Sequence, residues 1–252
     1  MTVHFIGAGP GAADLITVRG QSLIAAADVI VYAGSLVNPV LLQGARPGCA
    51  LHDSATMTLE ETTAVIEQAE GRGWTTVRLH SGDPSLYGAI HEQMRRLDAL
   101  GIDYDICPGV SSFSAAAAAL RLEYTVPELS QSVVITRMPG RTSVPDGETV
   151  AGFARHGSSM VIFLSTGLLP GLTSQLVDGG RSPDDPAAIV HRASWPDQQI
   201  VACTVGSLAQ AARAHGISSS ALIVLGPCLT RSETVSRLYA EDFSTGLRQA
   251  RP

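Results

Sequence analysis

The chain has 252 residues, of which 45% are hydrophobic, enough to bury a substantial core in one large domain or two small ones. Its formal net charge of −6 argues against a surface devoted to nucleic acid or to an anionic membrane. All 17 basic residues are arginine, which excludes a Walker-type phosphate loop, a pyridoxal-phosphate Schiff base and any lysine nucleophile.

The cysteines and histidines indicate neither disulfides nor a metal site. Cys49, Cys107, Cys203 and Cys228 are scattered, with no C-x-x-C pair and no signal peptide upstream, a pattern typical of reduced thiols. The seven histidines do not cluster either, so we predict no metal. No apolar run reaches membrane-spanning length. We therefore expect a soluble cytoplasmic protein with no membrane partner.

The first half of the chain alternates between strand and helix. The N-terminal strand is followed by a helix that Thr17 caps. Further on, the predicted strands are Val29–Tyr32, Thr75–His80 and Tyr104–Cys107, and the predicted helices are Val18–Ala27, Thr58–Glu70, Leu86–Leu100 and Ser111–Leu122. This alternation predicts an α/β fold with a mostly parallel sheet.

A second series follows the break around Pro127. Its predicted strands are Ser132–Thr136, Met160–Leu164, Ala187–Arg192, Gln199–Thr204 and Ala221–Leu225, with helices at Leu169–Val177 and Ser207–His215. Only six residues join the third of these strands to the fourth, which predicts an antiparallel pair and a mixed sheet. We place the boundary near residue 125, giving domains 1–124 and 125–252. Beyond Thr230 the tail has few apolar anchors, so we expect it to be partly mobile.

The N-terminal strand runs into Gly7, Gly9 and Gly11, which let the backbone turn sharply and lie close to a ligand. With Ala12 they fit the dinucleotide fingerprint G-x-G-x-x-G/A. We reject NAD(P) because the helix starts only after Thr17, and because Ala33-Gly34 stands where a ribose-binding acid is expected. A tight turn without a ligand is the simpler alternative.

Three glycine-containing turns follow strands of the first half, at residues 7–11, 81–88 and 108–112. In a parallel sheet these turns share the carboxyl edge, so we expect them to converge on one crevice. Asp83, between Gly82 and Pro84, is placed to accept hydrogen bonds from a ligand; an Asx turn or a helix cap is the alternative.

Other residues of these turns also have two interpretations. Ser111 and Ser112 open a helix, where they serve as caps or as ligand contacts. Tyr87 either stacks on an adenine or fills the core.

These turns also resemble a known family. Phe5 to Gly11, Leu15 to Gly20, Ser81-Gly82-Asp83-Pro84 and Pro108 to Ser112 are similar to the S-adenosylmethionine-dependent tetrapyrrole methyltransferases. The resemblance covers nearly the whole chain in the same order. Ile135 to Arg141 and His191 to Gln198 resemble the branch that methylates C-11 of precorrin-4 in cobalamin biosynthesis.

The resemblance implies two α/β domains with the methyl donor in a cleft between them, a tetrapyrrole substrate and a homodimer. It also implies the residues that touch S-adenosylmethionine and its product S-adenosylhomocysteine: Pro10, Gly82, Asp83, Pro84, Tyr87, Ser111, Ser112, Leu164 and Ala193. Leu164 replaces a methionine that is frequent in relatives, and Ser112 an alanine, so these two contacts are expected from the backbone.

The residue inventory is consistent with methyl transfer. No nucleophile, catalytic triad or metal cluster is evident, and displacement at a methyl sulfonium depends on alignment rather than on a strong acid. For the carboxylates of a tetrapyrrole we select Arg137, Arg141 and Arg192, each of which is otherwise an ordinary surface arginine. We assign no general base. The alternatives are another ring position, such as C-2, C-17 or C-1 and C-7, and a nucleotide-binding protein without turnover.

Overall fold

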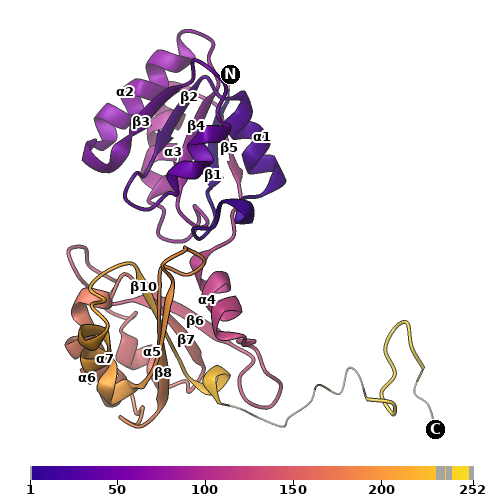
Figure 1. Cartoon of the computed structure of the whole chain (residues 1–252), viewed down its shortest axis with the longest axis vertical. Coiled ribbons are helices and arrows are strands. Elements are labelled where there is room, and N and C mark those ends of the chain that lie inside the picture. Colours follow the sequence, from indigo (N-terminus) through magenta and orange to yellow (C-terminus); the bar gives the residue numbers. More distant parts are fainter. Residues whose placement is uncertain (1, 231–235, 237–239, 250–252) are drawn as a thin grey trace. The chain divides into compact units, whose positions relative to one another are not determined.

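A computed structural model of the protein describes residues 2–230, 236 and 240–249 (Figure 1). By their mutual contacts, these residues form two compact units. The first runs to Ala116 and includes Arg192–Gln198; the second contains Ala117–His191 and the described residues from Gln199 onward. Each unit holds its own sheet with covering helices, which confirms the predicted α/β class.

The first unit is built on a parallel sheet with the strand order β3-β2-β4-β1-β5. Its strands are β1 (Val3–Gly7), β2 (Val29–Tyr32), β3 (Ala50–Asp53), β4 (Thr76–His80) and β5 (Tyr104–Cys107). Its helices are α1 (Val18–Ala26), α2 (Leu59–Glu70), α3 (Ile90–Leu100) and the start of α4 (Ser112–Leu120). The short 3-10 turns are η1 (Ala13–Leu15), η2 (Pro39–Gly44) and η3 (Ser54–Thr56).

Helices cover both faces of this sheet, as the alternation of side chains along β1 shows. Phe5 packs in a cluster with Ile66 of α2 and Leu97 of α3. The next residue, Ile6, packs instead with Ile24 of α1. Successive side chains of a strand point to opposite faces, so α1 lies on one face and α2 with α3 on the other (Figure 1). Parallel sheets are generally buried in this way, and the strand ends are then left for a site.

Threonine side chains cap the starts of α1 and α2, and the first of these caps was predicted. The Thr17 side chain accepts a hydrogen bond from the Gly20 N–H at 3.0 Å, so α1 begins at Val18, well after the glycines, as predicted. Thr58 and Glu61 form a reciprocal capping box at the start of α2.

Strand β3 is an addition to the prediction, which placed no strand between Val29–Tyr32 and Thr75–His80. The strand pairs only with β2 and has alternating half-buried and exposed residues. Its last residue, Asp53, accepts a hydrogen bond from the Gly34 N–H at 3.0 Å. A four-residue edge strand with a His and an Asp has too weak a pattern to be recognised locally.

The second unit has a mixed sheet with the strand order β6-β7-β10-β8-β9. The strands are β6 (Val133–Arg137), β7 (Ser159–Phe163), β8 (Pro186–His191), β9 (Gln199–Thr204) and β10 (Ala221–Leu225). The helices are α5 (Val150–Ala154), which we did not predict, α6 (Leu169–Asp178) and α7 (Leu208–Ala214). Three more 3-10 turns are η4 (Thr166–Leu168), η5 (Val205–Ser207) and η6 (Pro227–Leu229). β8 and β9 pair antiparallel, as their short connection predicted.

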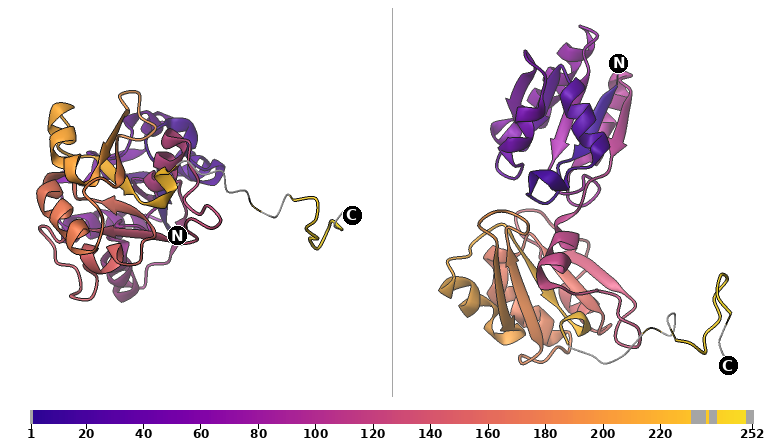
Figure 2. Two further views of the ribbon diagram at one scale, coloured as in Figure 1. Left: turned by 90° about the horizontal axis from the view of Figure 1, so that it is seen from below. Right: turned by 45° about the vertical axis from the view of Figure 1, so that its right-hand side comes forward.

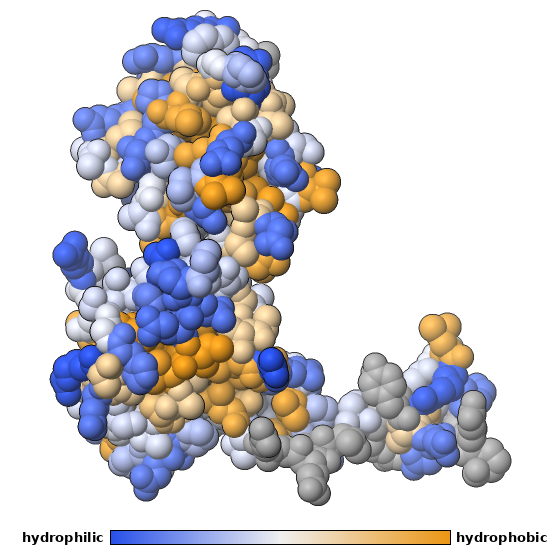
Figure 3. All heavy atoms as spheres, viewed as in Figure 1, coloured by the Kyte–Doolittle hydropathy of each residue, from blue (hydrophilic) through white to orange (hydrophobic). Residues whose placement is uncertain are grey.

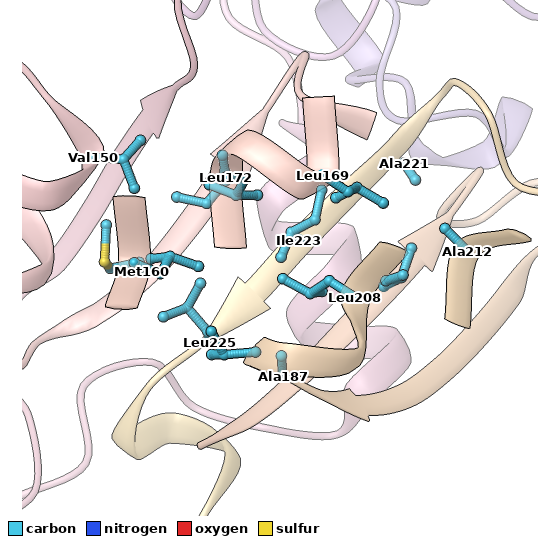
Figure 4. Packing of buried hydrophobic residues seen from close by; sticks show 14 of the residues in the cluster. Val150, Met160, Leu169, Leu172, Ala187, Leu208, Ala212, Ala221, Ile223 and Leu225 are labelled. Atoms are coloured by element: carbon cyan, nitrogen blue, oxygen red, sulfur yellow. The ribbon is translucent and has the colours of Figure 1, made fainter. Parts of the chain in front are cut away.

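The core of the second unit lies between its sheet and helices α5, α6 and α7. Figure 4 shows Leu172 and Leu169 of α6 facing Ile223 of β10, and Leu208 of α7 on the same layer. These side chains are buried, three of them completely, so this layer stabilises the unit by removing apolar surface from water.

The division between the units differs from the predicted domains 1–124 and 125–252. It falls after Ala116, inside α4, rather than in the loop around Pro127, and it assigns Arg192–Gln198 to the first unit. Figure 2 shows the two units in further views. Our expectation of a partly mobile tail concerns the chain beyond Thr230, of which residues 231–235, 237–239 and 250–252 lie outside the described part.

The surface carries hydrophilic and hydrophobic residues side by side (Figure 3), as is normal for a folded protein. Among the described residues, no helix combines the length and the apolar character needed to cross a bilayer.

Candidate functional site

The turns after β1 and β4 are joined backbone to backbone. Gly9 and Gly82 form an antiparallel bridge, in which the Gly9 N–H donates to the Gly82 carbonyl at 3.2 Å and the Gly82 N–H donates back at 2.8 Å. The Ala8 N–H also donates to the His80 carbonyl at 2.7 Å. The first two of the three predicted turns therefore meet at the carboxyl edge of the sheet.

The third turn reaches the same place because Gly109 and its neighbour Gly7 have no side chains. A Cβ atom on Gly7 would lie 2.5 Å from the Cα of Gly109 and from the carbonyl oxygen of Gly82. A Cβ on Gly109 would meet the same carbonyl at less than 3.0 Å. Only glycine allows three backbones to pack so closely. We call the backbone of Gly7, Gly9, Gly82 and Gly109 the glycine platform; it confirms the predicted convergence.

Asp83 holds this platform together. Its Oδ2 accepts a hydrogen bond from the Gly109 N–H at 2.8 Å, while its Oδ1 accepts from the Ser85 N–H at 2.9 Å and from the Ser85 hydroxyl. Partial burial raises the pKa of Asp83, but these hydrogen bonds outweigh it and leave the pKa below its usual value. Asp83 is therefore ionised at neutral pH and forms the Asx turn that we considered for it. A ligand contact from the same carboxylate stays a prediction.

The segment after Asp83 is a strained turn rather than the start of a helix. We predicted a helix from Leu86, but α3 begins at Ile90, because Tyr87 and Ala89 have φ angles of 59° and 51° in the left-handed region. Tyr87 is 43% exposed, so its predicted core-filling alternative is wrong. Strained residues of this kind persist where the surroundings fix them, often at ligand sites.

Helix α4 starts beside the platform. Ser111 is buried at the N-cap position, where its carbonyl accepts the first N–H bonds of the helix. A Cβ on Gly82 would lie 3.6 Å from the backbone nitrogen of Ser112, which places the first turn of α4 against Gly82. Free N–H groups at a helix start favour oxygen acceptors of a ligand.

The loop Arg192–Gln198, which joins β8 to β9, packs on the glycine-rich turn of the first unit. The Trp195 Nε1–H donates to the Pro10 carbonyl at 3.0 Å, and the Ser194 hydroxyl accepts from the Ala12 N–H at 3.0 Å. Ala193, between these residues and Arg192, is buried. Contacts across more than 180 residues in sequence thus complete this edge of the first unit.

His80, the last residue of β4, is 5% exposed and belongs to the core below the platform. Burial, and then the charge of Arg78, lower the pKa of His80 to about 3, so the ring is neutral. Arg78 is itself buried and donates to the Gln93 side chain at 2.9 Å and to the Val31 carbonyl at 3.2 Å. Within the described ranges, no group of three or more His, Cys, Asp or Glu residues is arranged to hold a metal ion.

In a comparison with known protein families, residues 2–209 match the family of the Tetrapyrrole (Corrin/Porphyrin) Methylases. The chain belongs to the tetrapyrrole methylases. It is 47% identical to a precorrin-4 C(11)-methyltransferase from Sinorhizobium sp. over 98% of both chains.

Two solved structures are also similar to this methylase. A cobalt precorrin-4 methyltransferase matches with a TM-score of 0.89 and 43% identity, over 91% of this chain and 96% of that one. A uroporphyrin-III C-methyl transferase from Thermus thermophilus, in complex with S-adenosylhomocysteine, matches with a TM-score of 0.75 and 26% identity, over 93% and 97%. The predicted family and fold are confirmed.

The second unit of the methylase carries the remaining predicted residues. Leu164 follows β7 with a φ of 51° and is 67% exposed, a costly arrangement for a leucine. The buried Ser165 fixes the backbone beside it, since its hydroxyl donates to the Phe163 carbonyl at 2.6 Å and accepts from the Met138 N–H at 2.9 Å.

Arg137 and Arg141 lie in and after β6. The Arg137 guanidinium donates to the carbonyls of Met138, Thr142 and Ser143 at 3.2, 3.2 and 2.6 Å. It therefore shapes the loop that carries Arg141, which is exposed. Leu164 and these arginines stay predicted contacts.

Sequence reasoning missed what Trp195 and Ser194 do in the methylase. Both belong to a stretch that we used only for its resemblance to the family. Their partners, Pro10 and Ala12, are far away in the chain, so no local pattern indicates the contact. The glycine at position 11 is a weak signal in hindsight, since it provides the space that the indole occupies.

Proposed function

We propose that this methylase transfers the methyl group of S-adenosylmethionine to C-11 of precorrin-4, giving precorrin-5 and S-adenosylhomocysteine in cobalamin biosynthesis. The proposal is supported by 47% identity to a precorrin-4 C(11)-methyltransferase over nearly the full length of both chains. It is also supported by the structural match to a cobalt precorrin-4 methyltransferase at a TM-score of 0.89.

The glycine platform is the observation that carries the methyl-donor site. It brings three turns together at the carboxyl edge of the sheet with no side chains on its own four residues, and a relative of the same fold holds S-adenosylhomocysteine. The proposed contacts in the first unit are Pro10, Gly82, Asp83, Pro84, Tyr87, Ser111, Ser112 and Ala193. We propose Leu164 as a further contact because a strained, exposed leucine is a poor choice for stability alone.

The reaction suits this residue set. An electron pair of the ring carbon forms the new C–C bond as the S–CH3 bond breaks, and the bonding pair goes to sulfur, which leaves as a neutral thioether. The positive charge passes from sulfur to the ring and is discharged when the ring loses a proton. The leaving group needs no proton, so alignment is the main requirement and supplies roughly 7–11 kcal/mol in well-oriented reactions. The ionised Asp83 adds a negative charge to the platform, which suits a cationic methyl donor.

The tetrapyrrole carboxylates need cations in this acidic protein. We propose Arg141 and Arg192 as direct ligands, because arginine binds carboxylates through two parallel hydrogen bonds. Asp197 orients Arg192 by accepting from its Nε at 2.8 Å. Arg137 is a further proposed contact, and because three carbonyls already accept hydrogen bonds from its guanidinium, it also holds the loop that carries Arg141.

We further propose that the methylase acts in the cytoplasm as a homodimer without a nucleic-acid partner. The net charge of −6 and the absence of a membrane-spanning helix among the described residues are consistent with this proposal. Light scattering coupled to size exclusion measures the mass directly, and a mass of 26.3 kDa for the particle would contradict the dimer.

The test of the reaction uses S-adenosylmethionine labelled in the methyl group. The protein is incubated with precorrin-4, cobalt-precorrin-4, precorrin-3 and uroporphyrinogen III in separate reactions. We expect label in precorrin-4 or its cobalt form, and the ratio between these two arms identifies the natural substrate. Label in precorrin-3 or uroporphyrinogen III alone would contradict C-11 as the position, and S-adenosylhomocysteine binding without transfer would favour a binding protein.

A further inference from the structure

The indole of Trp195 fixes one particular turn of the platform edge. Its Nε1–H donates to the Pro10 carbonyl at 3.0 Å, which orients the peptide group between Pro10 and Gly11. A Cβ on Gly11 would lie within 3.0 Å of three indole atoms, so the ring edge fills the space that any other residue at position 11 would need. The next peptide is held as well, because the Ala12 N–H donates to the Ser194 hydroxyl.

Other residues of the loop fix the position of the indole. The guanidinium carbon of Arg192 lies 4.1 Å above the centre of the Trp195 ring, and the Arg192 Nε donates to Asp197. The Ser194 N–H donates to the Gln198 side chain at 2.7 Å.

This loop is also strained. Arg192 and Ser194 have φ angles of 48° and 68°, a cost that residues without a special role seldom bear. The surrounding contacts therefore compensate for an unfavourable backbone in order to present Trp195 and Ser194 to the turn.

We propose that Trp195 is a positioning residue for the methyl donor: through its hydrogen bond to Pro10 it sets the shape of the Pro10–Ala12 turn against which the donor binds. This inference rests on the proposed function. Trp195 need not touch the donor, because its effect passes through the Pro10 carbonyl.

The test compares two matched variants of the full chain, Trp195→Phe and Trp74→Phe. Trp74 is the only other tryptophan and also has an arginine over its ring, Arg72 at 4.7 Å, but it precedes β4 at the opposite end of the sheet. Phenylalanine at position 195 keeps an aromatic ring for Arg192 and for Gly11, and it removes the N–H donor together with part of the ring volume.

We expect Trp195→Phe to raise the dissociation constant of S-adenosylhomocysteine, measured by calorimetry, about 3- to 10-fold, the range for one lost hydrogen bond. The KM for S-adenosylmethionine should rise with it, while the KM for the tetrapyrrole stays unchanged. Trp74→Phe should leave all three values unchanged. Because Trp195 is then the only tryptophan, its fluorescence emission in that variant should change when S-adenosylhomocysteine is added.

The outcomes separate this inference from the function on which it rests. If the wild-type chain binds S-adenosylhomocysteine and Trp195→Phe binds it equally well, the positioning role is wrong and the proposed function stands. If the wild-type chain does not bind it, both are wrong. Should Trp195→Phe fail to fold by circular dichroism, Ser194→Ala replaces it, with the same direction of change expected from the loss of the Ala12 contact.

Discussion

The Asp83 carboxylate accepts a hydrogen bond from the backbone N–H of Gly109 at 2.8 Å and so ties the turn after β4 to the turn after β5. The same carboxylate closes its own turn through Ser85. One side chain thus fixes the relative positions of two of the three turns in the glycine platform. Its removal should affect the platform as a whole rather than a single contact.

Asp83→Ala should weaken S-adenosylhomocysteine binding by about 1–3 kcal/mol, because it leaves the partly buried Gly109 N–H without its acceptor. Calorimetry gives the dissociation constant. The matched control is Asp105→Ala, which removes a carboxylate that pairs with His4 at 2.6 Å on the same sheet. Equal affinities of wild type and Asp83→Ala for S-adenosylhomocysteine would show that Asp83 only forms its local turn.

Gly7→Ala should destabilise the first unit by about 1–3 kcal/mol and abolish measurable binding of S-adenosylhomocysteine. The added Cβ would meet backbone atoms of Gly82 and Gly109 at 2.5 Å, and backbone cannot move aside as a flexible side chain can. Gly44→Ala is the control, since its Cβ would meet only an Ile24 methyl at 4.0 Å. Urea unfolding measures the loss of stability, and calorimetry measures the loss of binding. Normal binding by Gly7→Ala would show that the backbones of the glycine platform can move apart without loss of the site.

Local patterns in the sequence predicted most of the elements because their signals lie within a few residues. Thr17 capped the first helix where expected, and the six-residue link between β8 and β9 produced the antiparallel pair. The convergence of the three turns followed from parallel topology alone, since strand ends in such a sheet share one edge.

What could not be predicted depends on contacts distant in sequence. The late start of α3 reflects the left-handed backbone at Tyr87 and Ala89, which the tertiary structure imposes against helix propensity. The docking of Trp195 on Pro10 depends on residues 185 positions apart. The division of the chain within α4, and the transfer of the loop after His191 to the first unit, come from such contacts as well.

Leu172→Ala should lower the free energy of unfolding by about 2–5 kcal/mol, because Leu172 is completely buried between α6 and the second sheet (Figure 4). Val177→Ala on the same helix is the control, since that side chain is 38% exposed. Urea unfolding followed by circular dichroism compares the two. Equal losses would mean that the layer around Leu172 refills the cavity.

His80 should make stability depend on pH. Above pH 6.5 the ring is neutral in both the folded and the unfolded chain. Between pH 6.5 and about 3, the unfolded chain binds a proton that the folded protein does not, since burial lowers the folded pKa to about 3. The free energy of unfolding should therefore fall as the pH falls through this range, by up to about 1.4 kcal/mol for each pH unit.

His80→Phe isolates this contribution, because it keeps an aromatic ring beside Phe5, whose ring centre lies 6.0 Å from that of His80. The difference between the wild-type and variant unfolding free energies, measured in urea from pH 6.5 to 4.5, should shrink or reverse in sign toward low pH. This pH interval lies above the range in which Asp83 titrates. Because the pKa of Asp83 is lowered in the folded protein, its ionised carboxylate stabilises the fold at higher pH, and that stabilisation is lost only as the carboxylate protonates. Parallel profiles for the two proteins would show that His80 takes up its proton in the folded state, and hence that the core around it admits water.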